Sequence, residues 1–100
     1  MTRRQNHAKA LLAEVEAMDL LASWGYTAQR VHLSRGPFDV VAYNRQKVLF
    51  VQVKYQGTRS SPGYLAAHAL MHEMAVPANV ERWLFVWRGD LNDWWIREQV

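Results

Sequence analysis

The sequence predicts one α/β domain, with a central mixed β-sheet flanked by helices in the order α-β-β-β-α-β-β. The chain has 100 residues, and half of them are hydrophobic. That is the size of a single domain, and it supplies enough apolar side chains for a core. Helices are expected on both sides of a run of three strands, which is typical of helices packed against a sheet.

The first helix is expected from Asn6 to Ser23. Asn6 is a residue type favoured at helix N-caps, and Gly25 is favoured just after a helix ends. Apolar residues recur three and four positions apart, as they do on one face of a helix. The expected buried face consists of Ala8, Leu11, Leu12, Val15, Met18 and Ala22. Residues 1–6 are polar and basic, and we expect them to form a flexible arm.

Short apolar runs separated by turn-forming residues predict the strands. They are expected at 26–33, 40–43, 48–53, 83–87 and 94–97. Residues 44–47, which are Asn-Arg-Gln-Lys, form a polar turn between the second and third strands. A second helix is expected at 64–75, after a loop rich in glycine and serine at 56–63, and it should end before Pro77.

Composition narrows the function classes. The net charge of +3 and the pI near 9.6 favour an anionic partner modestly, although many proteins carry such a charge only for solubility. There is no cysteine, which rules out disulfides and thiolate metal sites and fits a reducing cytoplasm. Arg3 and Arg4 are not followed by the apolar run of a signal peptide. No apolar run approaches the ~20 residues of a membrane helix, so we expect a cytoplasmic protein without a membrane partner.

Three polar residues of the hairpin segment are expected to meet on one face. Any symmetric turn pairs Tyr43 with Val48, which places Asp39 opposite Gln52 with Cβ atoms about 5 Å apart. Lys54 follows Gln52 by two residues and therefore returns to the same face. A slip of the register by one residue would break this arrangement, because Asp39 would no longer share a face with Gln52 and Lys54.

This combination suggests a metal-dependent centre that hydrolyses phosphodiesters. A divalent cation neutralises developing charge and lowers the pKa of a bound water, and Mg²⁺ prefers oxygen ligands. Asp39 offers a carboxylate, Gln52 a neutral amide oxygen and Val53 a backbone carbonyl. Lys54 would orient or deprotonate the attacking water, or hold the scissile phosphate. Taken singly, each residue is better explained as a solvated polar group at a strand end, whereas the three together on an otherwise apolar hairpin favour the metal centre.

The spacing of these residues matches three motifs of a nuclease family. The first is a Glu eleven residues before a Gly-aromatic pair, here Glu14 before Gly25-Tyr26. The second is the run 39–42 (DVVA), which follows a turn that contains Ser34. The third is the run 52–54 (QVK), which begins thirteen residues after Asp39. The pattern resembles the PD-(D/E)xK nuclease superfamily, most closely the archaeal-type Holliday-junction resolvases. The resemblance covers most of the chain, but its motifs are short and degenerate.

The resemblance implies a restriction-endonuclease-like fold and a Mg²⁺-dependent endonuclease, with Mn²⁺ as a possible substitute, that cuts branched DNA as a homodimer. It implies that Glu14, Asp39, Gln52 and Lys54 are catalytic. The implied metal ligands are Glu14, Asp39, Gln52 and the backbone carbonyl of Val53. Gln52 stands where the family usually has Glu, although some branches, including certain homing-type endonucleases, use QxK. Losing this charge weakens metal binding.

Glu14 competes with Glu16 for the helix position. The two side chains lie on opposite flanks of the expected apolar face, so periodicity does not distinguish them. The family spacing selects Glu14, and the alternative is that Glu14 is an ordinary surface residue.

Contacts to DNA phosphates are expected from basic and hydroxyl side chains, and such binding depends strongly on salt. The expected residues are Arg3, Arg4, Lys9, Arg30, Ser34, Arg35 and Arg59. Each cation is also explained by solubility alone. His68 and His72 have a metal-ligand spacing, but without an evident third ligand we interpret them as a pair on a helix face. The chain has five Trp, and we expect some of Trp87, Trp94 and Trp95 at a homodimer interface.

Two other functions stay open. A sequence-specific homing or restriction endonuclease of the same fold would need recognition segments for which this chain has little room. A non-catalytic DNA-binding module would keep the fold and lose the hydrolysis. Metal-dependent cleavage separates the second of these from the nucleases.

Overall fold

The structure, a computed structural model, describes residues 3–31, 37–88 and 93–100. These residues form two helices and five strands in the predicted order α-β-β-β-α-β-β. The elements are α1 (Arg3–Ser23), β1 (Thr27–Arg30), β2 (Val40–Tyr43), β3 (Val48–Tyr55), α2 (Pro62–Glu73), β4 (Val80–Arg88) and β5 (Asp93–Gln99). The strands make one sheet in the order β1-β2-β3-β4-β5. Only β3 and β4 are parallel neighbours among these strands, so the predicted mixed sheet is confirmed.

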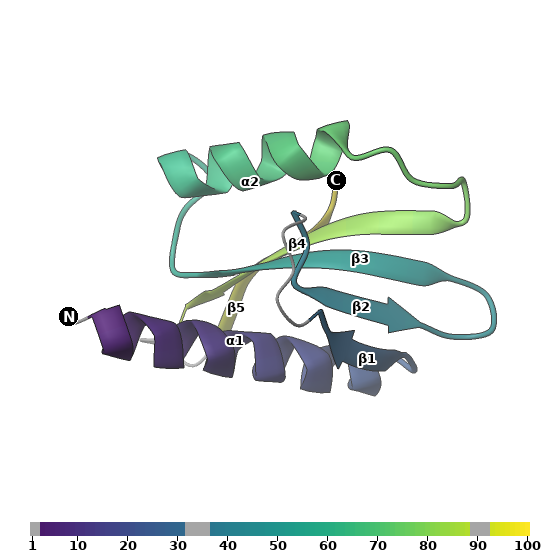
Figure 1. The fold of residues 1–100 in the computed structure, drawn as a ribbon, viewed down its shortest axis with the longest axis horizontal. Coiled ribbons are helices and arrows are strands. Elements are labelled where there is room, and N and C mark those ends of the chain that lie inside the picture. Colours follow the sequence, from purple (N-terminus) through teal and green to yellow (C-terminus); the bar gives the residue numbers. More distant parts are fainter. Residues whose placement is uncertain (1–2, 32–36, 89–92) are drawn as a thin grey trace.

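The two helices cover opposite faces of the sheet, as Figure 1 shows. Parallel neighbours require a crossover, and α2 supplies it between β3 and β4. The β4 strand is apolar on both faces because it meets both layers. Phe85 and Trp87 belong to the core under α1, while Leu84 and Val86 belong to the core under α2. Neither helix in the described ranges is long and apolar enough to cross a membrane.

The β2–β3 hairpin has the predicted register, with Tyr43 opposite Val48. Its turn is held by Asn44, whose Oδ1 accepts hydrogen bonds from the backbone N–H groups of Gln46 at 2.8 Å and Lys47 at 2.9 Å. Such a side-chain bond to the following backbone is the reason that Asn favours turns. The turn therefore fixes which residues of the two strands face each other.

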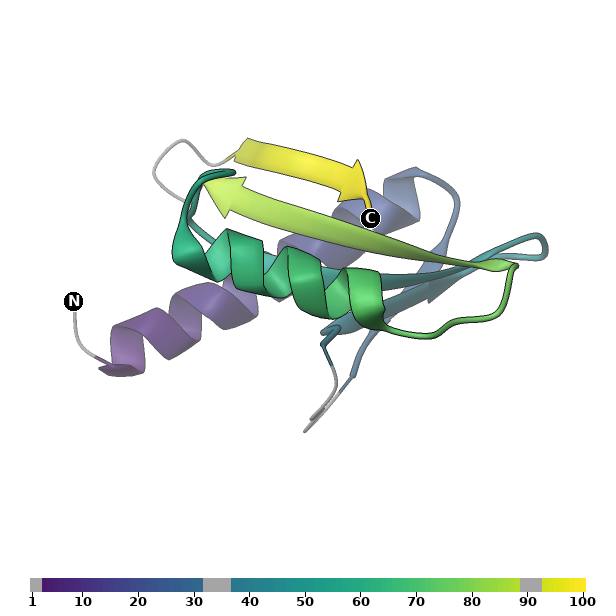
Figure 2. The same ribbon diagram turned by 90° about the horizontal axis from the view of Figure 1, so that it is seen from above.

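The first helix begins at Arg3 instead of Asn6, so residues 3–6, which were expected in a flexible arm, are helical. Arg and Gln are good helix formers, and they extend the helix past the expected N-cap. Seen from above in Figure 2, the N-terminal half of α1 reaches beyond the strands, as it also does in Figure 1.

The expected buried face of α1 is wrong for most of its residues, although Met18 is half-buried and packs against the core. Ala13, Ala17 and Leu21 are fully buried against the sheet, whereas Leu12 and Val15 are 48% and 41% exposed. The small alanine side chains allow the helix backbone to approach the strands closely, and Leu21 fills the space near the C-terminal end. Because α1 has apolar residues on two faces, periodicity alone could not select the face that packs.

The other element bounds shift by a few residues. The second helix occupies Pro62–Glu73 because Ser61 caps it, accepting from the backbone N–H of Tyr64 at 3.4 Å, and Pro62 fits the first helical turn. The first strand is shorter than expected within the described residues, and both β4 and β5 are longer.

The expected role of the Trp residues at a dimer interface is wrong for Trp87, which is 5% exposed and packed inside the domain. Trp94 packs on Phe85 and Trp87, with ring centroids 5.5 and 6.2 Å apart. The side chain of Trp95 lies outside the described part of the structure. Trp87 therefore offers little surface to a partner, and the expectation that some of the other two Trp residues lie at a dimer interface stays a prediction.

The packing of α1 gives a direct prediction. Ala17→Leu inserts three carbons where the helix contacts the sheet, and overpacking should lower the free energy of unfolding by about 1–3 kcal/mol. Ala10→Leu, on an exposed position of the same helix, should change it by less than about 0.5 kcal/mol. Urea unfolding measures both, and an unaffected Ala17→Leu variant would contradict the observed packing of α1.

Candidate active site

The backbone of Asp39 is fixed between two neighbouring strands. Its N–H donates to the carbonyl of Val51 at 2.8 Å, and its carbonyl accepts from the N–H of Val31 at 2.8 Å. The residue lies immediately before β2, where the ladder with β3 begins at the Val40–Val51 pair. Its side chain is therefore presented at a defined point on the edge of the ladder.

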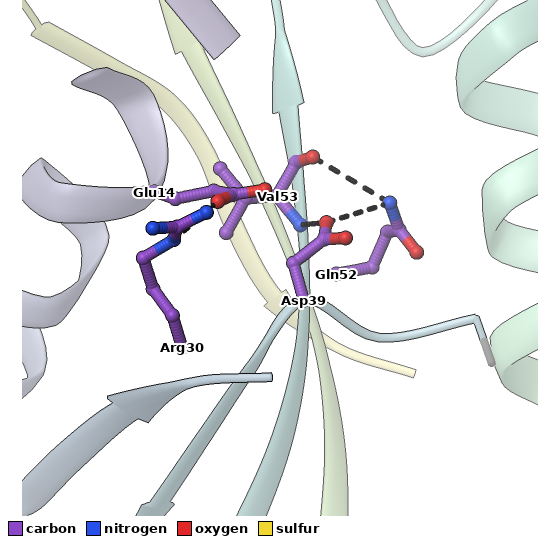
Figure 3. A network of polar contacts seen from close by, with 5 residues as sticks. All are labelled: Glu14, Arg30, Asp39, Gln52 and Val53. Atoms are coloured by element: carbon purple, nitrogen blue, oxygen red, sulfur yellow. Dashed lines mark hydrogen bonds and ion pairs between the residues drawn. The ribbon is translucent and has the colours of Figure 1, made fainter. Parts of the chain in front are cut away.

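The carboxylate of Asp39 bridges to β3 through two hydrogen bonds, drawn in Figure 3. Oδ2 accepts from the backbone N–H of Val53 and from Nε2 of Gln52, each at 3.0 Å. The N–H of Val53 lies beyond the β2–β3 ladder, and the carboxylate satisfies it in place of a backbone carbonyl. Asp39 and Gln52 thus meet across the hairpin, as their register predicts.

Gln52 presents its nitrogen, not its oxygen, to the site. Nε2 lies 3.0 Å from Oδ2 of Asp39 and 3.5 Å from the carbonyl oxygen of Val53. In Figure 3 the amide oxygen of Gln52 points away from both. The orientation follows from this hydrogen-bond network, and half a turn about the last side-chain bond exchanges nitrogen and oxygen. Only the turned amide can bind a cation as expected from the sequence.

Lys54 is partly buried and lies two residues beyond Gln52 on β3, so both side chains lie on one face. Its positive charge acts on Asp39, where it lowers the pKa of the carboxyl. The expected grouping of Asp39, Gln52 and Lys54 is therefore seen in the geometry of this strand end.

Glu14 reaches the same region from α1 and is held by Arg30 of β1. Its Oε2 lies 2.8 Å from Nε of Arg30, and the side chains of Arg30 and Glu14 are 38% and 21% exposed. Its charge also raises the pKa of Asp39. The structure thus brings Glu14 to the centre, but with an internal cation as its partner.

Burial is the main reason that the pKa of Asp39 lies above its usual value, because the ionised form loses hydration. The hydrogen bond from Val53 opposes this shift, Glu14 adds to it, and the charges of Lys54 and Arg30 oppose it. A half-buried carboxylate near a second carboxylate is an environment typical of functional sites.

The donor set fits a hard divalent cation. Asp39 and Glu14 carry carboxylates, the Val53 carbonyl and the Asp39 carboxylate both contact the Gln52 amide, and a turned Gln52 amide would add an oxygen. Mg²⁺ is commonly held by one or two carboxylates with water completing the shell. The described ranges contain no group of three His, Cys, Asp or Glu side chains placed to hold a metal. This centre would therefore depend on two acids and neutral oxygens.

Three of the cations expected on DNA have partners inside the domain. Arg30 pairs with Glu14, the side chain of Arg59 is 63% exposed and lies 3.3 Å from Glu98, and Lys9 lies over the ring of Tyr55. Arg3 and Arg4 are in the first turn of α1, and their side chains lie outside the described part. Ser34 and Arg35 fall in the undescribed segment 32–36.

The histidines of α2 form a pair on a helix face. The rings of His68 and His72 are stacked 6.3 Å apart, and the ring of His68 also lies 5.9 Å from that of Tyr64. No third ligand joins them in the described ranges. The stacking accounts for their spacing without a metal.

Sequence reasoning missed two contacts of the site. One is the Glu14–Arg30 ion pair, whose members are sixteen residues apart on different elements. The other is the N–H of Val53, which anchors Asp39. Neither has a sequence signal, because one depends on how α1 packs and the other on where the backbone ladder ends.

The raised pKa predicts a pH dependence for stability. The folded protein binds a proton at Asp39 more tightly than the unfolded chain, so stability is lost as the pH rises from the ordinary value of 3.8 toward the raised one. The Asp39→Asn variant has no carboxyl at this position and does not lose stability in this way. Measured by urea unfolding in the presence of a chelator, its free energy of unfolding relative to the wild type should therefore rise between about pH 4 and pH 7.

Asp19→Asn, on an exposed position of α1, makes the same change away from the site and is the matched control against which the trend is compared. If Asp39→Asn instead loses stability relative to the wild type as the pH rises, the ionised carboxylate would be a net stabiliser of the fold.

Comparison of the chain with models of known protein families, and with curated proteins, finds no match.

Proposed function

We propose that the chain is a metal-dependent endonuclease with a restriction-endonuclease-like fold, which cuts branched DNA such as four-way junctions. The observation that carries this proposal is the convergence of Asp39, Gln52 and the Val53 carbonyl at the end of the β2–β3 ladder. Lys54 lies on the same strand face. A half-buried carboxylate with a raised pKa, at the open end of a hairpin, is unexplained by packing alone.

Each residue has a chemical role in this proposal. A bound divalent cation would supply a water of lowered pKa and charge for the phosphate. Asp39 and Val53 would hold the cation, Glu14 would complete the set, and Gln52 would give a neutral oxygen. Lys54 would orient the attacking water or hold a non-bridging phosphate oxygen.

The substrate class rests on the motif resemblance and on charge. The net charge of +3 suits a phosphate backbone, and phosphate contacts would give binding that depends on salt more than on sequence. Two symmetric cuts across a junction call for a twofold dimer, so a homodimer is part of the proposal. Trp87 is not proposed as a residue of its interface. A cytoplasmic location is also part of the proposal.

A non-catalytic DNA-binding module is the second candidate, and one observation favours it. The amide nitrogen of Gln52 occupies the space between the Asp39 carboxylate and the Val53 carbonyl. A neutral N–H donor there satisfies both oxygens without a cation. Such a site would persist as a structural hydrogen-bond network after catalysis had been lost.

Cleavage separates the two candidates. We expect paired nicks in a labelled four-way junction with Mg²⁺ or Mn²⁺, no nicks in a chelator, and little cutting of a linear duplex of the same sequence. Asp39→Asn should lower cleavage by at least ~100-fold, as for loss of a metal ligand or its support, and should keep junction binding within a few-fold. Tight binding without cleavage in either metal would select the second candidate.

Gln52→Glu tests the ligand assignment. Without metal, this change removes the N–H donor and places two carboxylates together, so the melting temperature should fall. With Mn²⁺, the added carboxylate should tighten binding roughly tenfold, which corresponds to about 1.4 kcal/mol, and should restore the melting temperature.

Gln46→Glu, in the exposed hairpin turn, adds the same charge away from the site and should show neither effect. A Gln52→Glu variant that binds Mn²⁺ more weakly than the wild type would contradict the assignment.

A further inference from the structure

We propose that Arg30 couples metal binding to DNA binding by exchanging Glu14 for a DNA phosphate. This inference rests on the proposed function and adds a regulatory step to the same site. In the free protein, Arg30 is the counter-ion of Glu14. On DNA, the guanidinium would contact a phosphate, and Glu14 would become available to the cation.

Arg30 is placed beside the centre by the sheet itself. It is the last residue of β1 and pairs with Val40, the residue that follows Asp39. The next residue, Val31, donates its N–H to the carbonyl of Asp39 at 2.8 Å. A phosphate held by Arg30 would therefore lie near the carboxylate that is proposed to hold the cation.

The ion pair has the features of an exchangeable contact. Nε of Arg30 binds Oε2 of Glu14 at 2.8 Å, while a guanidinium has five N–H donors in all. A phosphate oxygen can therefore bind before the carboxylate is released. The side chains are 38% and 21% exposed, and ion pairs this exposed to water contribute little to stability. Arginine also suits phosphate because its planar fork can make two parallel hydrogen bonds.

The positive charge of Arg30 opposes cation binding until the guanidinium moves from Glu14 to a phosphate. Glu14 raises the pKa of Asp39 and Arg30 lowers it, so the three charges already act on one another. Arg30 and a divalent cation are alternative counter-charges for the same two carboxylates. Cation binding is therefore opposed while the guanidinium remains on Glu14. Moving the guanidinium to a phosphate removes this opposition and leaves Glu14 with a free carboxylate.

Linkage turns this exchange into a measurable quantity. If DNA tightens cation binding by a certain factor, the cation must tighten DNA binding by the same factor. Arg30→Gln removes the competing charge permanently. The free variant should bind the cation more tightly than the wild type, bind DNA more weakly, and lose most of the coupling factor.

The test is a calorimetric titration of Ca²⁺ into the free protein and into its complex with a four-way junction, at constant ionic strength. Ca²⁺ is used because it also binds carboxylate and carbonyl oxygens. The Asp39→Asn complex corrects for Ca²⁺ held by the DNA alone. We expect the junction to tighten Ca²⁺ binding at least about fivefold in the wild type and less than about twofold in Arg30→Gln.

Arg45→Gln is the matched control. Arg45 is exposed in the turn at the other end of the β2–β3 hairpin, so this variant loses the same charge and should keep the coupling factor. Arg30→Lys preserves a charge and should recover part of the factor. The urea midpoints of the variants show whether each one folds. If Arg30→Gln does not fold, the coupling factor is measured in Arg30→Lys instead.

The outcomes distinguish the two levels of the proposal. Unchanged Ca²⁺ affinity and an unchanged coupling factor in Arg30→Gln would overturn the exchange and leave the proposed nuclease intact. Absence of any Asp39-dependent Ca²⁺ binding, with or without the junction, would overturn both.

Discussion

The hydrogen bond from the N–H of Val53 to Oδ2 of Asp39 is the contact on which the rest of the site depends. It forms because the β2–β3 ladder ends at the Val40–Val51 pair and leaves the next N–H of β3 to a side chain. The register that places Asp39 there is set by the Asn44 turn at the far end of the hairpin. Inserting or deleting one residue in this turn would shift the register and turn Asp39 to the face opposite Gln52 and Lys54. A local backbone signal thus determines whether the three chemical groups meet.

N–H groups of the protein itself donate hydrogen bonds to the oxygens of the candidate centre. Arg30 binds Glu14, and the amide of Gln52 lies between Asp39 and Val53. Burial nevertheless leaves the pKa of Asp39 raised, because the ionised carboxylate is less hydrated here than in water. Binding a cation would require both donors to move, one by rotation of an amide and one by leaving an ion pair. This requirement links the proposed catalysis to the proposed role of Arg30. It also explains why a glutamine at position 52 does not by itself decide between an active and an inactive site.

The fold was more predictable than the contacts of the site. Turn chemistry and alternation were enough for the hairpin register, because both are local properties of the chain. They were insufficient for α1, where Leu12 and Val15 obey helical periodicity as well as Ala13 and Ala17 do, and only the shape of the sheet selects the smaller residues. The grouping of Asp39, Gln52 and Lys54 followed from the register. The partner of Glu14 and the orientation of the Gln52 amide depend on packing and on hydrogen bonds between distant elements, which no spacing encodes.

The anomalous difference map of a crystal soaked in Mn²⁺ tests whether the oxygens around Asp39 form a site for a divalent cation. We expect a peak bounded by the Asp39 carboxylate and the Val53 carbonyl, with the Gln52 amide turned so that its oxygen faces the metal. A map without a peak, in which Nε2 of Gln52 still donates to Asp39, would contradict the claim and identify the centre as a structural hydrogen-bond network.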